Sequence, residues 1–412
     1  RPLPRVGSPF PVGSGAMPKR FSILVLVALL GLAVLAGCGS DSGADSNGDP
    51  GSDQDAKPIA TSDADPVLLD SNGSEFNPSK VYAETIDGVV SIRSIFGDIE
   101  NSPATTSVAG GSGFVLADNG EIVTNAHVIS DGNGDDRKAA DEVYVEFSSG
   151  DVLDAEIVGF DPFADVGLLK VSNDQVEMKP LTLADSDKVA VGQPIAVIGS
   201  PFGEDQTLTT GVVSQTGRSV MSLTDFQIEG AIQTDASINP GNSGGPMLDG
   251  NGHVIGISQQ MKSGSGSSDG VGFGVPANTI KRSVEMLRDG GEPQYAYIGV
   301  STEPLYPQLA EKLGLDTDKG AIVAEVVEGG PADEAGIRGS DQRLIFQGAR
   351  YDVGGDVIVG VNGVSIERAE DLGRLVGALK PGDTARIEVI RDGEHKEIDV
   401  ELENRPTAVT RP

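Results

Sequence analysis

The chain has 412 residues, of which 38% are hydrophobic, and a formal net charge of -32. This length allows two or three domains, each with its own core. So large a negative charge excludes nucleic-acid binding through a basic surface. We interpret it as a solvated acidic surface, and a halophilic adaptation would also fit. Aromatic residues make up only 4% of the chain, which has 56 glycines, so short strands and turns are favoured over a helical bundle.

The N-terminal part has the features of an export signal. Lys19 and Arg20 precede an apolar run over residues 21–36, and small residues lead to Cys38, which is the only cysteine. The run is shorter than the roughly 20 residues that span a bilayer comfortably, so residues 1–37 are predicted to be upstream residues and a secretory signal. The letters LAGC resemble the bacterial lipobox, which implies lipidation of Cys38 and an extracytoplasmic, membrane-anchored protein. The alternative is an uncleaved anchor, and in either case one cysteine forms no internal disulfide.

Two composition changes divide the rest of the chain. Residues 38–76 are rich in Gly, Ser and Asp without periodicity, which predicts a disordered acidic tether. Asn77 and Pro78 then have the order of an N-cap and a first helical residue, so a helix is expected near 78–86.

Residues 77–290 form the first predicted domain. Short apolar runs with turns between them, such as "GSGFVLA", "VGLLKV" and "PIAVIGS", favour an all-β sandwich or barrel. A closing helix is expected over 278–288. A linker rich in glycine follows, and residues 295–403 form a second, smaller unit with five strands and a helix that carries Leu372 and Leu375. Residues 404–412 are expected to be a frayed tail.

The stretch "TDASINPGNSGGP" surrounds Ser243 with glycines. The pattern G-x-S-x-G is also typical of the α/β-hydrolases, whose acid and histidine follow the serine. Only His253 and His395 follow Ser243, and neither suits that order. The βαβ pattern of those enzymes is also missing, so an esterase is disfavoured.

His127 and Asp165 precede Ser243, which is the chymotrypsin-type order on an all-β fold. A serine hydroxyl is a weak nucleophile, so a histidine must accept its proton, and an acid must hold the imidazole and offset its charge. Asp161 is a rival for the acid. The glycines are expected to let the backbone N–H groups of Gly241 and Ser243 approach a developing oxyanion.

Several longer motifs carry a family resemblance: "TNAHVI", "DPFADVGLLKV", "QTDASINPGNSGGPMLDGNGHVIGI" and "GFGVPAN". With them, residues 78–403 resemble the HtrA/Deg serine proteases. The resemblance implies a chymotrypsin-like double β-barrel followed by one PDZ domain. It also implies a trimeric, ATP-independent extracytoplasmic endoprotease for misfolded proteins, without cofactor or metal. Gly167 departs from the usual Ala, and the short loop at about 97–109 resembles that of regulatory trimeric members.

The resemblance also implies binding residues. The oxyanion hole would use Gly241, Asn242 and Ser243. The S1 pocket would be lined by Ser237, Ile238, Ser258 and Gln259, and without an acid there a small or medium aliphatic P1 residue is expected. The run 263–272 falls where an activation loop would border that pocket, and a plain surface loop is the alternative.

The second unit resembles a PDZ domain, which pairs a peptide with an exposed strand edge and holds its terminal carboxylate. Tyr297, Ile298, Gly299 and Val300 match the carboxylate-binding loop, and Leu372 and Leu375 would form the opposite wall. The insert 338–354 is expected to be a lid hairpin. A proteolytically inactive chaperone or PDZ-binding lipoprotein is the competing function, against which the complete set of three catalytic residue types argues.

Overall fold

The computed structural model describes residues 75–408, except residues 99, 100, 104, 105, 173, 201–205, 260–269, 289 and 291. The predictions for Cys38, for the signal and tether up to residue 74, and for most of the run 263–272 therefore lie outside the described residues. In the described part, no helix is both long and apolar enough to cross a membrane.

The first helix begins where the sequence places it. In α1 (Pro78–Thr85), the side chain of Asn77 accepts a hydrogen bond of 3.0 Å from the backbone N–H of Lys80, and Pro78 occupies the first turn. Val81 and Thr85 are buried against the protein, so the cap and the apolar contacts together fix this helix.

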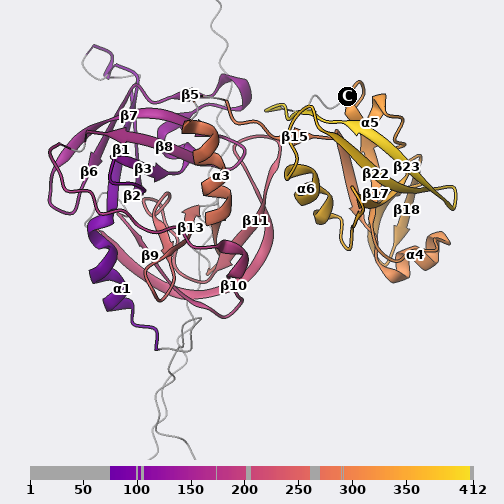
Figure 1. Cartoon of the computed structure of the whole chain (residues 1–412), viewed down its shortest axis with the longest axis horizontal. Coiled ribbons are helices and arrows are strands. Elements are labelled where there is room, and N and C mark those ends of the chain that lie inside the picture. The colour runs from indigo at the N-terminus through magenta and orange to yellow at the C-terminus, as the bar shows by residue number, and fades with distance from the viewer. Residues whose placement is uncertain are drawn as a thin grey trace, which may run out of the picture. The chain divides into compact units, whose positions relative to one another are not determined.

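Six strands close the first barrel in the order β1-β2-β3-β8-β7-β6 (Figure 1). Their inward side chains form an apolar core that includes Ile92, Ile122 and Leu169. The strands are β1 (Val89–Phe96), β2 (Ser107–Val115), β3 (Glu121–Thr124), β6 (Glu142–Glu146), β7 (Val152–Asp161) and β8 (Val166–Val171). Shorter elements near them are η1 (Ile86–Gly88), α2 (Ala126–Ile129), β4 (Ser130–Asp131), η3 (Gly134–Asp136) and β5 (Lys138–Ala139).

A second closed barrel follows, in the order β10-β11-β14-β13-β12-β9. It contains β9 (Pro194–Gly199), β10 (Thr207–Met221), β11 (Gln227–Thr234), β12 (Pro246–Leu248), β13 (Val254–Gln259) and β14 (Gly272–Pro276), with η4 (Ser186–Lys188) before it. The helix α3 (Ala277–Arg288) then buries Ile280, Val284 and Leu287, as its sequence predicts. The predicted double β-barrel is confirmed.

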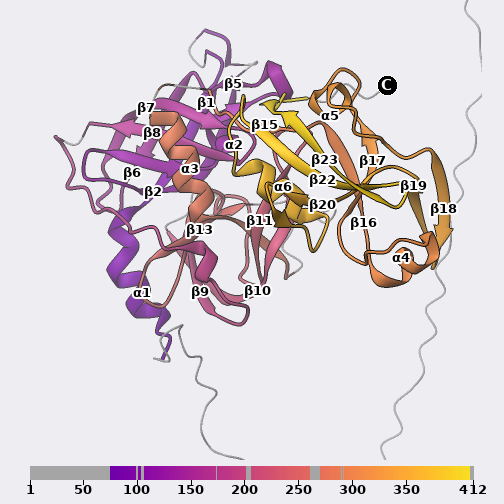
Figure 2. The same ribbon diagram turned by 45° about the vertical axis from the view of Figure 1, so that its right-hand side comes forward.

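The second unit is built on a sheet ordered β16-β17-β20-β22-β23, against which α6 packs (Figure 2). Leu372 and Val376 of α6 join Val323, Ile358 and Ile387 in its core. The strands are β15 (Ala296–Tyr297), β16 (Val300–Pro304), β17 (Ala321–Val326), β18 (Gln342–Phe346), β19 (Ala349–Val353), β20 (Val357–Val361), β21 (Val364–Ser365), β22 (Thr384–Arg391), β23 (Glu394–Glu401) and β24 (Glu403–Asn404). The helices are α4 (Pro307–Leu313), α5 (Pro331–Glu334) and α6 (Glu370–Gly377).

The insert 338–354 forms the expected hairpin, because Gln342–Phe346 and Ala349–Val353 pair antiparallel within it. The expected lid function is not tested by this pairing. The tail prediction is wrong for Asn404, which pairs with Ala296 of β15 and so belongs to the folded unit.

A buried ion pair holds the second unit together. The guanidinium of Arg391 donates two hydrogen bonds of 2.6 Å to the two carboxylate oxygens of Asp356, which is 1% exposed. Asp356 also accepts the backbone N–H of Arg338. Because a buried carboxylate without its partner is strongly disfavoured, this pair is sensitive to the loss of either side chain.

Arg391→Ala should therefore lower the free energy of unfolding of the second unit by about 3–5 kcal/mol, measured by urea denaturation of the full chain. Arg343→Ala is the matched control, because Arg343 pairs with Asp352 at the surface and is 74% exposed. The control should lower this free energy of unfolding by at most about 1 kcal/mol. Equal costs for the two variants would contradict a special role for the buried pair.

Candidate active site

Asp165 lies at the end of the turn between β7 and β8, and its side chain is fully buried. Its backbone φ is 55°, in the left-handed region that Asp and Asn tolerate better than most residues. The side-chain amide of Asn125 donates to the backbone carbonyl of Asp165 at 2.8 Å, which holds this unusual backbone in place.

His127 faces this carboxylate. It lies on the short helix α2, just after β3, because the chain leaves the extended conformation of the strand after Asn125, which is the N-cap of this helix. Nδ1 of His127 lies 2.8 Å from Oδ2 of Asp165, and the backbone N–H of His127 donates to Oδ1 at 3.0 Å. Since a carboxylate only accepts, Nδ1 carries the proton and Nε2 is left as the base.

The electrostatics of His127 follow from this contact. Burial opposes protonation of the imidazole, but the charge of Asp165 and its hydrogen bond outweigh burial, so the pKa of His127 lies above its ordinary value. The positive charge of Arg137 lowers the pKa of His127 and so makes this increase smaller.

Asp161, the rival acid, has a different role. Oδ1 accepts the backbone N–H groups of Phe163 and Ala164, and Oδ2 accepts the hydroxyls of Ser283 at 2.6 Å and Tyr295 at 2.5 Å. Burial raises the pKa of Asp161, although these four hydrogen bonds oppose the rise. Asp161 therefore shapes the turn that leads to Asp165.

Ser243 lies in a buried turn that is held against the first barrel. The backbone N–H of Ser112 in β2 donates to the carbonyl of Ser243 at 2.8 Å. A Cβ at position 244 would lie 2.2 Å from the carbonyl oxygen of Ser112, and one at position 245 would lie 2.2 Å from that of Ile198. Only glycine allows the backbone after the serine to approach these two carbonyl groups so closely.

The turn before Ser243 alters one expectation. Asn239 to Asn242 form a type II turn, with Pro240 in the second position and Gly241 in the third at a φ of 103°. The backbone N–H of Asn242 donates to the carbonyl of Asn239 at 3.0 Å, so it closes this turn. The expectation that Asn242 contributes to an oxyanion hole is therefore wrong for its backbone N–H, and Gly241 and Ser243 remain the candidates.

Two of the four predicted S1 residues are engaged elsewhere. The hydroxyl of Ser258 donates to the carbonyl of Asn242 at 2.6 Å and so supports the serine turn. Ile238 is 5% exposed and packs with Ala236 in the core of the second barrel. Ser237 is exposed, and its role as the floor of S1 stays a prediction.

Gln259 needs a correction, because it contacts the carboxylate of Asp165. Its side-chain amide donates to Oδ2 of Asp165 at 3.0 Å, from β13 of the second barrel. The two residues are 94 positions apart, and no spacing in the sequence relates them. Gln259 is a positioning residue for Asp165 that sequence reasoning assigned to S1.

Gly167, the departure from the family pattern, has a local explanation. A Cβ at this position would lie 2.7 Å from the side chain of Ile129, on the helix that carries His127. The side chain of Ile129 thus occupies the space that the methyl group of an alanine at 167 would need.

The predicted peptide-binding loop lines a cavity of about 490 Å³, whose residues include Tyr297, Ile298, Gly299, Val300 and Leu372 from the second unit and Gln227 and Glu229 from β11 of the second barrel. Gly299 has a φ of 81°, which glycine adopts without strain. Leu375 is not among the lining residues and packs partly buried against the core, and its assignment to the wall stays a prediction. The next residue of α6, Val376, does line the cavity.

Within the described ranges, no group of three or more His, Cys, Asp or Glu side chains has the arrangement of a metal site.

Comparisons with known proteins agree with this geometry. Residues 111–257 match the model of a trypsin-like peptidase domain, and residues 296–402 match that of a PDZ domain. The solved structure of the HtrA-type protease AlgW with a tripeptide is 30% identical, has a TM-score of 0.65, and overlaps 80% of this chain and 98% of AlgW. The chain belongs to the HtrA family.

Curated relatives of this HtrA chain include probable periplasmic serine endoproteases that are DegP-like. The relative from Ectopseudomonas mendocina is 38% identical over 72% of this chain and 56% of its own length. That from Chlamydia trachomatis is 36% identical over 75% of this chain and 56% of its own length. The chain thus spans about half the length of these relatives.

From the hydrogen bonds of Asp165 we predict that two substitutions shift the pKa of His127 in opposite directions. Asp165→Asn should lower this pKa, because it removes the charge that raises it. Gln259→Leu should raise it further, because the carboxylate loses a competing donor and attracts the imidazolium more strongly. The chain has 3 histidines, so an NMR titration with labelled histidine resolves His127. Gln215→Leu, an exposed control in β10, should leave this pKa unchanged, and an unchanged value in Gln259→Leu would contradict the role of Gln259.

Proposed function

We propose that this chain is an ATP-independent, extracytoplasmic serine endoprotease that degrades misfolded or damaged proteins. The observation that carries the proposal is the contact of 2.8 Å between His127 and Asp165, beside a glycine turn that presents Ser243. An intact acid–histidine pair of this kind has no use in a chaperone that only binds, and it argues against the inactive alternative.

The geometry supports a defined sequence of steps. The hydroxyl oxygen of Ser243 attacks the scissile carbonyl while Nε2 of His127 accepts its proton, and Asp165 stabilises the imidazolium at Nδ1. The backbone N–H groups of Gly241 and Ser243 would stabilise the oxyanion, at about 3–4 kcal/mol for each donor. His127 then protonates the leaving amine, and water hydrolyses the acyl-enzyme by the same route.

The location of the chain outside the cytoplasm is supported by relatives named periplasmic. Membrane attachment through a lipidated Cys38 is our proposal from the apolar run and the letters LAGC that end at it. The tether would keep the folded domains away from the bilayer. Assembly as a homotrimer is proposed from the family resemblance alone.

The second unit would bind peptide C-termini. Its support is the loop from Tyr297 to Val300, which lines the cavity opposite Leu372 and Val376. Successive backbone N–H groups in such a loop can surround a carboxylate. AlgW has been solved with a tripeptide and with a decapeptide, which favours peptide recognition in this family member.

Ser243→Ala should slow degradation of an unfolded, reduced test protein by at least about 1000-fold, because no other nucleophile can replace the hydroxyl. His127→Ala should lose a similar factor, since the triad acts as a unit. The readout is the loss of intact substrate on a gel, with circular dichroism to confirm folding. His253→Ala, at a histidine that is 48% exposed, is the matched control and should remain active. Undiminished degradation by Ser243→Ala would overturn the proposed function.

The peptide-binding proposal has its own test. A peptide that ends in an apolar residue should bind the inactive Ser243→Ala chain at least about tenfold more tightly as a free acid than as a C-terminal amide, because unpaired donors cost about 1–3 kcal/mol. Fluorescence anisotropy measures both affinities. Equal affinities would contradict carboxylate capture and leave only strand addition.

A further inference from the structure

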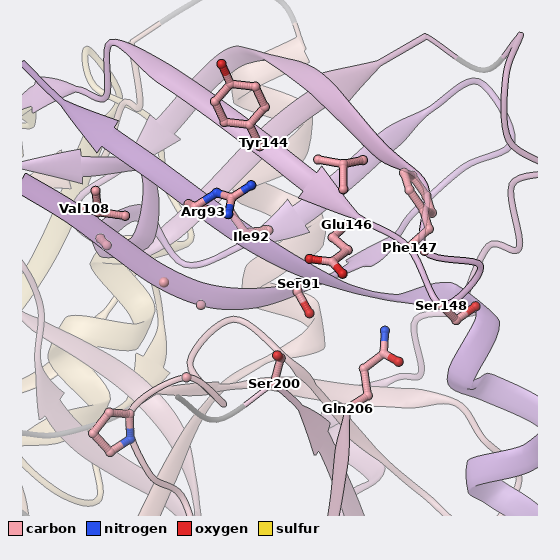
Figure 3. Close-up of a pocket in the computed structure, with 17 residues that line it drawn as sticks. Ser91, Ile92, Arg93, Val108, Tyr144, Glu146, Phe147, Ser148, Ser200 and Gln206 are labelled. Carbon is pink, nitrogen blue, oxygen red and sulfur yellow. The ribbon is translucent and has the colours of Figure 1, made fainter. Parts of the chain in front are cut away.

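A cavity of about 580 Å³ lies beside the serine turn and is not explained by the triad. Its lining includes Gly241 from the turn, Gly110 from β2, and Arg93 and Tyr144 from the outer face of the first barrel. Figure 3 shows Arg93 near Tyr144 and Ser91 on one side of the cavity, with Ser200 and Gln206 on the other. We propose that this cavity is a specificity subsite that takes an acidic side chain of the substrate, on the leaving-group side of the scissile bond. This inference rests on the proposed protease function.

The edge of β2 explains why a substrate would lie here. The backbone N–H of Ser112 points away from β1 and donates to Ser243, so the N–H and C=O groups of Gly110, two residues earlier, point to the same side. On that side β3 pairs only with Phe114 and Val115. The stretch of β2 next to Gly110 is therefore an open edge, to which an extended peptide can add as a strand.

The positions of the two barrels indicate which half of the substrate lies against β2. The half of the substrate that forms the acyl-enzyme would lie against the second barrel, where Ser237 is the predicted floor of S1. β2 belongs to the first barrel, on the other side of Ser243. It therefore faces the residues after the scissile bond, and we assign the residue opposite Gly110 to the second position after the cut.

Gly110 leaves Arg93 accessible to a substrate side chain. The two residues are directly paired across β2 and β1, so their side chains share one face of the sheet, and Tyr144 is next in the same row. A Cβ at position 110 would meet no atom within 4 Å. The substrate side chain opposite Gly110 and the guanidinium of Arg93 can thus meet over a residue that has no side chain of its own.

The charge of Arg93 determines which substrate side chains the cavity favours. Its guanidinium lies 5.7 Å from the centre of the Tyr144 ring, and no ion pair joins it to a carboxylate of the described chain. Glu146, the other charged residue of the lining, pairs with Ser91 in the neighbouring row and so stands further from the open edge. An acidic side chain opposite Gly110 therefore meets the cation first, whereas Lys or Arg would be repelled.

The edge continues to Val108, which also lines the cavity and is 56% exposed. Val108 faces the same open side as Gly110, two residues further from Ser243. The residue of the peptide opposite it would be apolar, because that contact removes apolar surface from water. The subsite thus fits an extended segment with an acidic residue followed, two positions later, by an apolar one.

The test is a digest of an unfolded protein by the full chain, with every cut site identified by mass spectrometry. In wild-type digests, Asp and Glu should be enriched at the second position after the cut by about three- to fivefold over Lys and Arg, as expected for a partly exposed ion pair. Arg93→Glu should reverse this preference, and added salt should weaken the preference of the wild type.

Arg350→Glu is the matched control, because it makes the same change of charge at an exposed position on the β18–β19 hairpin. It should leave the preference as in the wild type. The same cut-site distribution in wild type and Arg93→Glu would overturn the subsite. Absence of any cleavage by the wild type would instead overturn the protease function on which the subsite rests, so the two failures are distinguishable.

Discussion

The buried carboxylate of Asp165 is the interaction on which the active site depends. It accepts hydrogen bonds from the backbone and ring of His127 in the first barrel and from Gln259 in the second. Because a buried carboxylate needs all its partners, these contacts also fix the two barrels around it. The left-handed backbone of Asp165 is tolerated because Asn125 and the turn shaped by Asp161 hold it in place.

The glycines around Ser243 serve a second constraint, which is close packing of backbone on backbone. Gly244 and Gly245 let the turn lie directly against Ser112 and Ile198, and the contact with Ser112 aligns β2 beside the nucleophile. The same alignment leaves Gly110 at an open edge. A turn that positions the hydroxyl therefore also determines where an extended substrate can pair.

The sequence was informative where function depends on residue type and order. The order of His127, Asp165 and Ser243, the cap at Asn77 and the apolar stripe of α3 each depend on local chemistry, and the structure has them where the sequence predicts. It was less informative for side chains whose partner is distant. Gln259 and Ser258 were expected in S1, yet Gln259 donates to the carboxylate of Asp165 and Ser258 donates to the carbonyl of Asn242.

The sequence by itself determined the all-β class of the first domain and the chain order of His127, Asp165 and Ser243, because strand periodicity, turn residues and motif order are local properties. The double barrel and the PDZ fold were implied by the family resemblance. Tertiary structure distinguished Asp165 from Asp161: both precede β8, but Asp165 contacts His127, whereas Asp161 accepts hydrogen bonds within its own turn and from Ser283 and Tyr295. It also decided that Val376 of α6 lines the cavity beside the loop from Tyr297 to Val300, which depends on how α6 is rotated against its sheet. Such choices depend on contacts between residues far apart in the chain, and no local pattern encodes them.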